Sequence, residues 1–487
     1  MLPHHSDIDE AEHLAINMAV EPERDDFPRG VTSLPMELEE FLSRDACSLL
    51  IKGGAGTGKT ALALTILRAL DVRKNFIYLS TRTSPRHFFD YHPWLRDWLA
   101  EPPKKGKVPT ETPVPAAFVD ARLDEPTQLF ERVTGELMDA RAPVIVIDTW
   151  DSMQELAEGE SLEADMRVLQ AWCERANARL IVMKEEVLDT SFDSMMDGVL
   201  SLKQYEFEGR RTREISFSKL YGINVEHPSY FFTLKDGRFH AFEHYREEDF
   251  FAFAALTRVI TDVAQELPRT HPTGYRQLDS VLGGGIPSGS LLNVELAPEI
   301  HSRTGLVLLG GVVAACVKAG HQVLLFPFRG LDEDFTKNLL KNSIAPSRRK
   351  LVSQFWSEAK HDGTAQGSRT AGERTVESIR LARKKSRDGP VLAILGPDNF
   401  TPDGGGDPGL EDFADIVESG EGAGIVVTRE SDKALSERLS VIGSLYIKVA
   451  SVRGTLLVEP QRPMSKYFVA EVHKDAESAT IDVEPMV

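Results

Sequence analysis

The segment GGAGTGKT at positions 53–60 constrains this chain more than any other feature. It fits the pattern G-x-x-x-x-G-K-[ST] and lies between the apolar run CSLLIK (47–52) and the segment TALALTILRAL (60–70). Apolar residues in the latter recur at helical spacing, so the order is strand, glycine-rich turn, helix. Glycines let backbone N–H groups turn toward phosphate oxygens where a Cβ would block the approach. The sequence therefore predicts a phosphate-binding loop in an α/β domain.

Each residue type in this loop has its own expected role. Lys59 would bring a positive charge to the β- and γ-phosphates of a nucleotide, and the Thr60 hydroxyl would hold Mg²⁺. The helix that begins here adds a dipole that favours anions at its N-terminus. We therefore expect ATP and Mg²⁺ as cofactors. The predicted nucleotide contacts are Gly53, Gly54, Ala55, Gly56, Thr57, Gly58, Lys59, Thr60 and Ala61.

A second part of the site is expected at the apolar strand VIVID (144–148). In P-loop proteins an acid at the end of such a strand holds Mg²⁺, which makes Asp148 the metal-binding candidate beside Thr60. The alternative is an ordinary buried strand that ends before a polar turn. Asp151 is better explained as a helix cap.

Apolar runs alternate with helical stretches through both halves of the chain. This alternation indicates buried parallel strands covered by helices, and the period-two segments 213–242 and 441–472 indicate antiparallel hairpins at the sheet edges. The expected fold class is α/β, with tandem domains that each contain a mostly parallel sheet. The expected divisions are a disordered acidic tail (1–24), a nucleotide-binding domain (25–247), a linker helix (248–268), a degenerate second domain (269–473) and a tail (474–487).

The second half lacks the residues that the first loop supplies. The segment APEIHSRT (297–304) aligns with the first loop at an offset of 244 positions. Ser302 stands in the position of Gly58, and Arg303 in that of the lysine. Glu299 adds a negative charge, and Gly396 stands where the strand acid is expected. We predict a domain that no longer binds nucleotide and that serves as a lid or a docking surface. The alternative is that Arg303 still grips a phosphate-bearing ligand.

Charge and cysteine content argue against several classes of protein. The formal net charge of −19 argues against DNA binding as the main activity, so nucleic acid is not an expected partner. Cys47, Cys173 and Cys316 are too few and too far apart for a disulfide scaffold. The opening residues are not those of a signal peptide, and the longest apolar run (305–317) is too short to span a bilayer. We expect a cytoplasmic protein with no membrane partner.

Three segments resemble the RecA-like ATPases of the KaiC type. TGYRQLDSVLGGGIPSGSLL (273–292) is similar to the segment with which domains of that family open. MMDGVLSL (195–202) and the stretch SFSKLYGI…FFTLKDGRF (216–239) are similar to their closing strands. The resemblance covers nearly the whole chain and implies tandem RecA-like P-loop NTPase domains.

A narrower resemblance is to the GvpD family of archaeal gas-vesicle regulators. It rests on LLIKGGAGTGKTALAL (49–64), IYLSTRTSP (77–85) and YHPWL (91–95). It implies an ATP-binding regulator of a protein partner, for which a transcription activator is one candidate. Hydrolysis would be slow or stimulated by the partner, and the protein would form a homo-oligomer or a pseudo-dimer of its two domains.

GvpD-type proteins also have arginine-rich segments that are needed for regulation. The candidates here are GRRTR (209–213), SRRK (347–350) and RKKSR (383–387). Taken alone, each of these patches is interpreted as a solvated face.

Two departures from the KaiC pattern bear on catalysis. That family ends its second strand in paired glutamates that activate the attacking water, whereas this chain has Thr81, Arg82 and Thr83. Lys219 matches a lysine that the family sends into the neighbouring subunit, but Tyr221 stands in place of the arginine. The resemblance therefore implies secure binding with slow turnover.

A substitute base is available at the end of another core strand. Glu185 and Glu186 follow the apolar run RLIVMK (179–184), although acids at a strand end are also common as solvated side chains. The catalytic candidates are Lys59, Asp148 and Glu185. A RecA-type recombination ATPase that acts on DNA is the alternative function, and the net acidity and the missing arginine argue against it.

Overall fold

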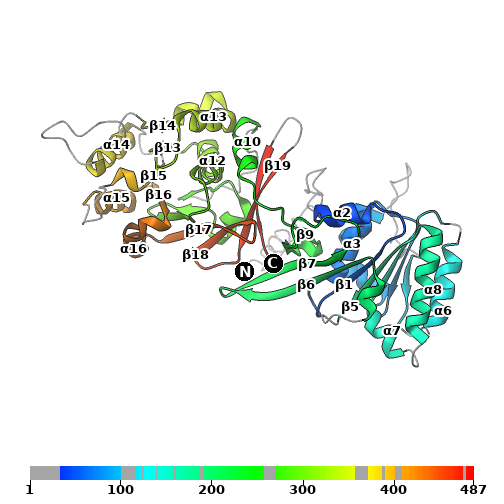
Figure 1. Ribbon diagram of the computed structural model, residues 1–487. Coiled ribbons are helices and arrows are strands. Elements are labelled where there is room, and N and C mark those ends of the chain that lie inside the picture. The colour runs from blue at the N-terminus through cyan, green and yellow to red at the C-terminus, as the bar shows by residue number, and fades with distance from the viewer. Residues whose placement is uncertain are drawn as a thin grey trace, which may run out of the picture. The chain divides into compact units, whose positions relative to one another are not determined.

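The computed structural model describes residues 33–99, 117–122, 124, 126–138, 140–156, 161–185, 191–256, 269–356, 371–385, 390–400, 408–419, 422–474 and 479–487. The tail expected at 1–24 lies outside these residues, as does the second part of the linker helix expected at 248–268. Two nine-stranded sheets, each flanked by helices, form the structure (Figure 1).

The first sheet has the strand order β3-β2-β4-β5-β1-β6-β7-β8-β9. The first six strands in this spatial order, from β3 through β6, pair in parallel. Strands β7, β8 and β9 are added antiparallel at one edge. The strands are β1 (Ser48–Lys52), β2 (Phe76–Ser80), β3 (Phe118–Asp120), β4 (Val144–Asp148), β5 (Arg179–Lys184), β6 (Gly198–Phe207), β7 (Arg210–Leu220), β8 (Ser229–Thr233) and β9 (His240–Ala241).

Helices cover both faces of this sheet because successive side chains of a strand point to opposite faces. Leu49 and Ile51 of β1 pack in the core that includes helices α2 and α3, whereas Leu50 packs in the core that includes α6 and α8 (Figure 1). The helices are α2 (Met36–Leu42), α3 (Lys59–Ala69), α4 (Pro85–Tyr91), α5 (Trp94–Leu99), α6 (Pro126–Glu136), α7 (Trp150–Leu156), α8 (Ser161–Ala176), α9 (Ser191–Met195) and the 3₁₀ turn η1 (Lys235–Gly237).

The second sheet has the order β14-β13-β15-β16-β12-β17-β18-β19-β20, and a separate two-stranded ribbon pairs β10 with β11. Position by position, this order repeats that of the first sheet. The strands are β10 (Thr270–His271), β11 (Ile286–Pro287), β12 (Leu291–Leu296), β13 (Gln322–Leu325), β14 (Val352–Gln354), β15 (Val391–Leu395), β16 (Ala423–Arg429), β17 (Leu445–Val452), β18 (Thr455–Arg462), β19 (Phe468–Lys474) and β20 (Ala479–Pro485).

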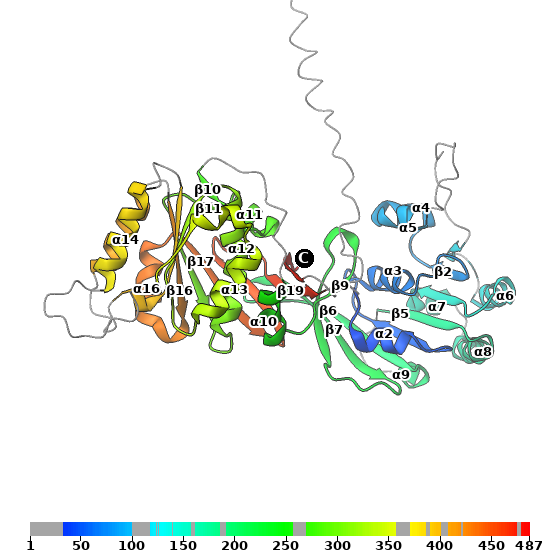
Figure 2. The same cartoon turned by 90° about the horizontal axis from the view of Figure 1, so that it is seen from above.

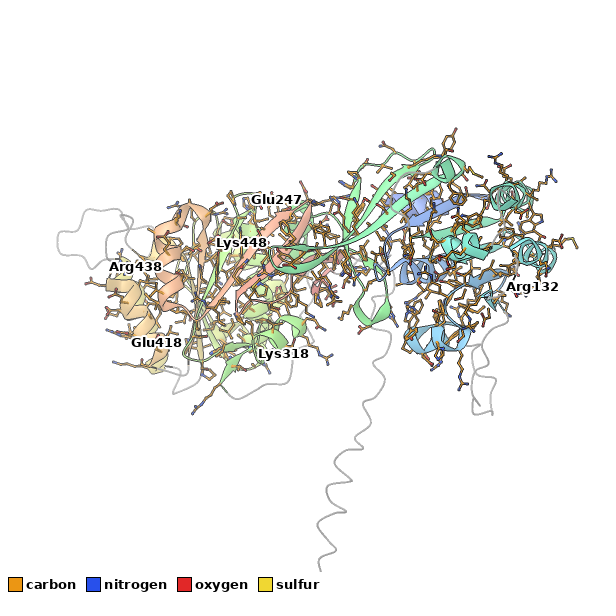
Figure 3. The ribbon with its side chains drawn as sticks, turned by 90° about the horizontal axis from the view of Figure 1, so that it is seen from below. Arg132, Glu247, Lys318, Glu418, Arg438 and Lys448 are labelled. Carbon is orange, nitrogen blue, oxygen red and sulfur yellow. The ribbon has the colours of Figure 1, made fainter. Side chains whose placement is uncertain are left out.

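Helices α10 to α13 pack on one face of the second sheet and α14 to α16 on the other (Figure 2). Charged side chains such as Lys318 and Arg132 are exposed (Figure 3). The helices are α10 (Glu247–Leu256), α11 (Arg276–Val281), α12 (Ser302–Lys318), α13 (Glu333–Ser343), η2 (Pro346–Leu351), α14 (Ala371–Lys385), η4 (Pro397–Asn399), α15 (Pro408–Glu418), η5 (Glu430–Asp432) and α16 (Lys433–Ile442).

The predicted fold class is confirmed: both halves are α/β, with large mostly parallel sheets and antiparallel edge strands. Among the described helices, none has both the length and the apolar composition needed to cross a bilayer.

The tail predicted at 474–487 is wrong. Residues 479–485 form β20, which pairs with β19 in register from Lys474 opposite Ala479 to Phe468 opposite Pro485. Ala479, Ile481 and Val483 are buried, so the segment alternates with the period of a strand that has one face on the core.

The interpretation of the basic patches as solvated faces is wrong for the first patch. Arg210 is 5% exposed, and its guanidinium donates to the carbonyl oxygens of Ser465 (2.5 Å) and Pro460 (2.8 Å). It also lies 4.7 Å from the centre of the Tyr467 ring. This arginine therefore binds the hairpin between β18 and β19.

The second basic patch closes the ends of two helices. Arg348 donates to the carbonyl oxygens of Val317 and Lys318 at the C-terminus of α12, and Arg349 donates to that of Lys341 in the last turn of α13. The last carbonyl groups of a helix have no partners within it and carry partial negative charge, which these guanidinium groups balance.

Replacing Arg210 with Ala should lower the free energy of unfolding by about 2–3 kcal/mol, because buried carbonyl groups would lose charged hydrogen bonds. Denaturant titration monitored by circular dichroism measures this change. The exposed neighbour Arg211 provides the matched control, and Arg211→Ala should change stability by less than about 0.5 kcal/mol. Equal effects of the two variants would contradict the assignment.

Candidate nucleotide-binding site

The loop between β1 and α3 has the backbone that its glycines were expected to permit. Gly53 has a φ of 158°, and a Cβ there would lie 2.7 Å from both the Leu202 carbonyl oxygen and Thr57 Oγ1. Gly58 has a φ of 102°, and a Cβ there would lie 2.9 Å from the methyl groups of Leu234. Both positions exclude a larger residue, so the loop depends on these two glycines.

The remaining predicted loop residues differ in their surroundings. Ala55 and Gly56 are exposed, whereas Ala61 is buried in the hydrophobic core beneath α3. Thr57 donates its hydroxyl to the Gly54 carbonyl oxygen at 2.8 Å, which closes the turn. Ala61 therefore contributes packing at the start of the helix, and the exposed loop backbone is the part that a ligand could approach.

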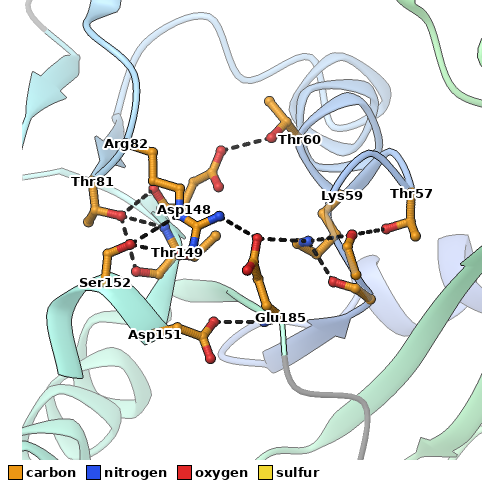
Figure 4. Close-up of polar contacts among 12 residues, drawn as sticks. Thr57, Lys59, Thr60, Thr81, Arg82, Asp148, Thr149, Asp151, Ser152 and Glu185 are labelled. Atoms are coloured by element: carbon orange, nitrogen blue, oxygen red, sulfur yellow. Dashed lines mark hydrogen bonds and ion pairs between the residues drawn. The ribbon is translucent and has the colours of Figure 1, made fainter. Parts of the chain in front are cut away.

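Lys59 is folded back over the loop (Figure 4). Its Nζ donates to the carbonyl oxygens of Gly53 (2.6 Å) and Gly54 (3.0 Å) and lies 4.0 Å from the Glu185 carboxylate. Burial lowers the pKa of Lys59, while the charge of Glu185 acts in the opposite direction. The ammonium group is thus held at the loop by weak acceptors that phosphate oxygens could replace.

Asp148 joins three elements through one oxygen. Thr60 of α3 donates to Asp148 Oδ2 at 2.9 Å, and Tyr78 of β2 donates to the same atom at 2.6 Å. Burial raises the pKa of Asp148, and the two hydroxyl donors oppose this rise. The structure thus brings together the two residues that the sequence proposes for Mg²⁺, and a hydroxyl and a carboxylate are the oxygen ligands that this ion prefers.

Tyr78 was not among the predicted residues. The signal for it in the sequence is weak: a phenol hydroxyl between the apolar residues of FIYL (76–79). Its contact with Asp148 depends on the pairing of β2 with β4, which places Ser80 opposite Asp148.

Glu185 occupies the end of β5 and faces the loop lysine (Figure 4). Its carboxylate pairs with the guanidinium of Arg82, which extends from the end of β2. The backbone N–H of Glu185 donates to Asp151 Oδ2 at 2.7 Å, and Arg82 Nε donates to Ser152 Oγ at 3.1 Å. Arg82, which stands where a glutamate was expected, therefore positions a glutamate from a different strand.

The other residues near the predicted site bond within the chain. Thr81 donates to the Asp148 carbonyl oxygen at 2.9 Å and accepts from the Thr149 N–H at 2.7 Å. Lys219 donates to the Met196 carbonyl oxygen at 2.6 Å. Glu186 lies outside the described residues.

A buried arginine connects the loop to the segment that follows β20. Arg213 is 7% exposed, and it donates through Nη1 to the Gly56 carbonyl oxygen at 3.0 Å and through Nε to the main-chain oxygen of Val487 at 2.8 Å. Val487 is held in addition by its N–H, which donates to Thr233 Oγ1 at 3.3 Å. From the sequence alone, this position is identified only as part of a basic patch.

The corresponding loop of the second half is closed by its own side chains. Arg303 pairs with Asp332 at 2.5 Å, and its guanidinium lies 5.0 Å from the centre of the Phe335 ring. His301 Nδ1 accepts the Arg303 N–H at 3.1 Å, which caps the helix that a phosphate would approach. The alternative that Arg303 grips a phosphate-bearing ligand therefore has no support in this geometry.

The metal position of the second half is also closed. A Cβ at Gly396 would lie 2.2 Å from the Phe328 Cβ, so an acid does not fit where Asp148 stands in the first half. Ser302 donates its hydroxyl to the Arg329 carbonyl oxygen and accepts from Arg429 Nη2, both at 2.7 Å. These contacts favour the prediction that this domain no longer binds nucleotide.

Comparisons with known proteins agree with the geometry of the first half. Residues 38–218 match the family model of the GvpD gas vesicle protein, P-loop domain. The chain is 22% identical to protein GvpD2 of Halobacterium salinarum over 496 aligned positions, which cover 94% of this chain and 97% of that protein. It is 28% identical to protein GvpD1 of the same organism over 296 positions, which cover 57% of this chain and 53% of that protein. These similarities confirm the predicted resemblance: this is a GvpD-like P-loop protein.

Proposed function

We propose that this GvpD-like P-loop protein binds ATP with Mg²⁺ and acts in gas-vesicle regulation, or in a related process, by controlling a protein partner. Its hydrolysis of ATP would be slow without that partner. The observation that carries the proposal is the convergence of Lys59, Thr60 and Asp148 at a loop whose glycines exclude side chains. The similarity to the gas vesicle proteins GvpD1 and GvpD2 supports the biological context.

In this proposal the first loop exchanges its internal contacts for phosphate. Lys59 would leave the carbonyl oxygens of Gly53 and Gly54 for the β- and γ-phosphates. Phosphate oxygens would replace these carbonyl groups as acceptors, so the buried ammonium group would keep hydrogen-bond partners. Thr60 and Asp148 would hold Mg²⁺, which neutralises charge that develops on the phosphates. Tyr78 would keep the carboxylate oriented, as outer partners of metal ligands do.

Glu185 is the proposed general base, and its environment would make turnover slow. A base must accept a proton from the attacking water through a free lone pair. Arg82 donates to Oε1 of the Glu185 carboxylate, and Lys59 Nζ lies 4.0 Å from the same oxygen. Both cations would compete with the attacking water for this oxygen. A partner that draws Arg82 away would release the carboxylate, which provides a route to stimulated hydrolysis.

The basic patches do not favour the recombination-type alternative. Arg210 and Arg213 are buried against other parts of the chain, and Arg348 and Arg349 are bonded to helix ends. Arg210 and Arg213 are therefore closed to a phosphate backbone, whereas the cations of the second patch are exposed. The net charge of −19 remains the argument against this alternative.

Replacing Lys59 with Ala should abolish the thermal stabilisation by ATP–Mg²⁺. Ligand bound at about 100 times its Kd stabilises the native state by about 2.7 kcal/mol, which scanning fluorimetry detects as a rise in Tm. The exposed Lys203 on β6 provides the control, and Lys203→Ala should keep the full shift. A full shift in Lys59→Ala would sink the loop assignment.

Replacing Glu185 with Gln should leave ATP binding intact and lower turnover, because the amide has nearly the same shape but cannot accept the proton. A positioned general base contributes about 10²–10⁴-fold to rate. Steady-state phosphate release and the ATP-induced Tm shift, measured on the same samples, separate the two effects. Glu174→Gln, on the exposed side of α8, is the control. Unchanged turnover in Glu185→Gln would assign the base to another group.

A further inference from the structure

Three metal-binding side chains meet in the second half, away from both loops. Single ligand atoms of His271, Cys316 and His321 all lie within 4.8 Å of one another. The two imidazole rings meet at an angle of 78°, with their Nδ1 atoms 3.1 Å apart. We propose that these three residues bind one transition-metal cation of the Zn²⁺ class.

The end of α12 brings two of these residues together. Cys316 lies in the last turn of the helix, which ends at Lys318. Gly320 has a φ of 89° and turns the chain back, so that the His321 N–H donates to the Cys316 carbonyl oxygen at 2.9 Å. This helix-terminating turn fixes the thiol and the imidazole side by side without any tertiary contact.

The third residue is held by the ribbon of β10 and β11. His271 pairs with Ile286, and a Cβ at Gly285 would lie 2.5 Å from the His271 carbonyl oxygen, so the two backbones are in close contact. The next residue, Pro272, accepts a weak hydrogen bond from Cys316 Sγ at 3.4 Å. The backbone on both sides of the cluster is therefore fixed before any ion binds, which is the condition for a specific site.

The chemistry of the cluster suits a borderline-to-soft cation. Two imidazole nitrogens and one sulfur are ligands typical of zinc, with metal–ligand distances of about 2.0–2.3 Å. A tetrahedral arrangement at such distances places two nitrogens about 3.3 Å apart, close to the observed 3.1 Å. Mg²⁺ and Ca²⁺ prefer oxygen ligands, so this site is distinct from the one proposed at Asp148.

Burial shows where an ion would enter. His271 and Cys316 are fully buried, whereas His321 is partly exposed. The fourth coordination position, to be filled by water, would therefore lie on the side of His321, and three protein ligands with one open position are an established arrangement for zinc.

Zinc retention by the full-length chain tests the proposal. Protein stripped with a chelator is given ZnSO₄, passed through gel filtration and analysed for metal. Wild type should retain one equivalent, and His321→Asn should bind at least about 100-fold more weakly, because loss of an outer-shell partner alone costs 10–100-fold. His227→Asn is the matched control, since His227 and His244 stack with ring centres 3.8 Å apart and form the other described histidine pair. The double variant His4→Asn/His5→Asn controls for the histidines near the N-terminus.

Cobalt provides a second readout that identifies the sulfur ligand. Co²⁺ bound to a thiolate gives a charge-transfer absorption in the near ultraviolet, which Cys316→Ser should remove and Cys173→Ser should retain. Thermal melting of the metal-free variants shows whether each one is folded. If Cys316→Ser does not fold, zinc retention by His321→Asn still tests the site. Absence of retained zinc in wild type, equal retention in His321→Asn, or loss of zinc only in the His227 or His4/His5 variants would overturn the site.

Discussion

A single carboxylate oxygen, Asp148 Oδ2, links three elements of the candidate site in the first half. It accepts from Thr60 at the start of α3 and from Tyr78 in β2, while its own residue ends β4. Parallel strands bring their carboxyl ends to the same edge, and only there can the ends of β2, β4 and β5 approach the loop that follows β1. The positions of Arg82 and Glu185 follow from the same geometry, since they extend from β2 and β5 beside that oxygen.

The second half shows that this fold does not depend on the site. Its sheet repeats the strand order of the first, yet Gly396 packs against Phe328 where an acid would be needed. Arg303, in the position of the loop lysine, pairs with Asp332 instead of remaining available to an anion. Buried apolar strands and covering helices are enough to form the architecture, and the chemistry of a site is added to it by a few residues that can be lost.

The sequence predicted those features whose cause is local. The loop glycines, Lys59 and Asp148 follow from short motifs with a fixed relation to a strand, and the α/β class follows from alternating apolar runs. Tyr78 and the support of Glu185 by Arg82 depend on which strands become neighbours, and a single sequence does not state this. The tail assigned to 474–487 was wrong because the seven residues of β20 were too short a pattern to recognise. The charge of Arg210 was evident, but its buried carbonyl partners lie 250 or more positions away.

The bonds of Arg213 have a thermodynamic consequence. One guanidinium supports both the carbonyl of Gly56 in the loop and the main-chain oxygen of Val487 beyond β20. The two bonds use different N–H groups of one rigid, planar guanidinium, so a movement of this group at one partner changes the geometry at the other. Linkage makes any coupling that results equal in both directions. A ligand that moved Gly56 would therefore disturb the bond at Val487, and a molecule that bound at Val487 would act back on the loop to the same extent.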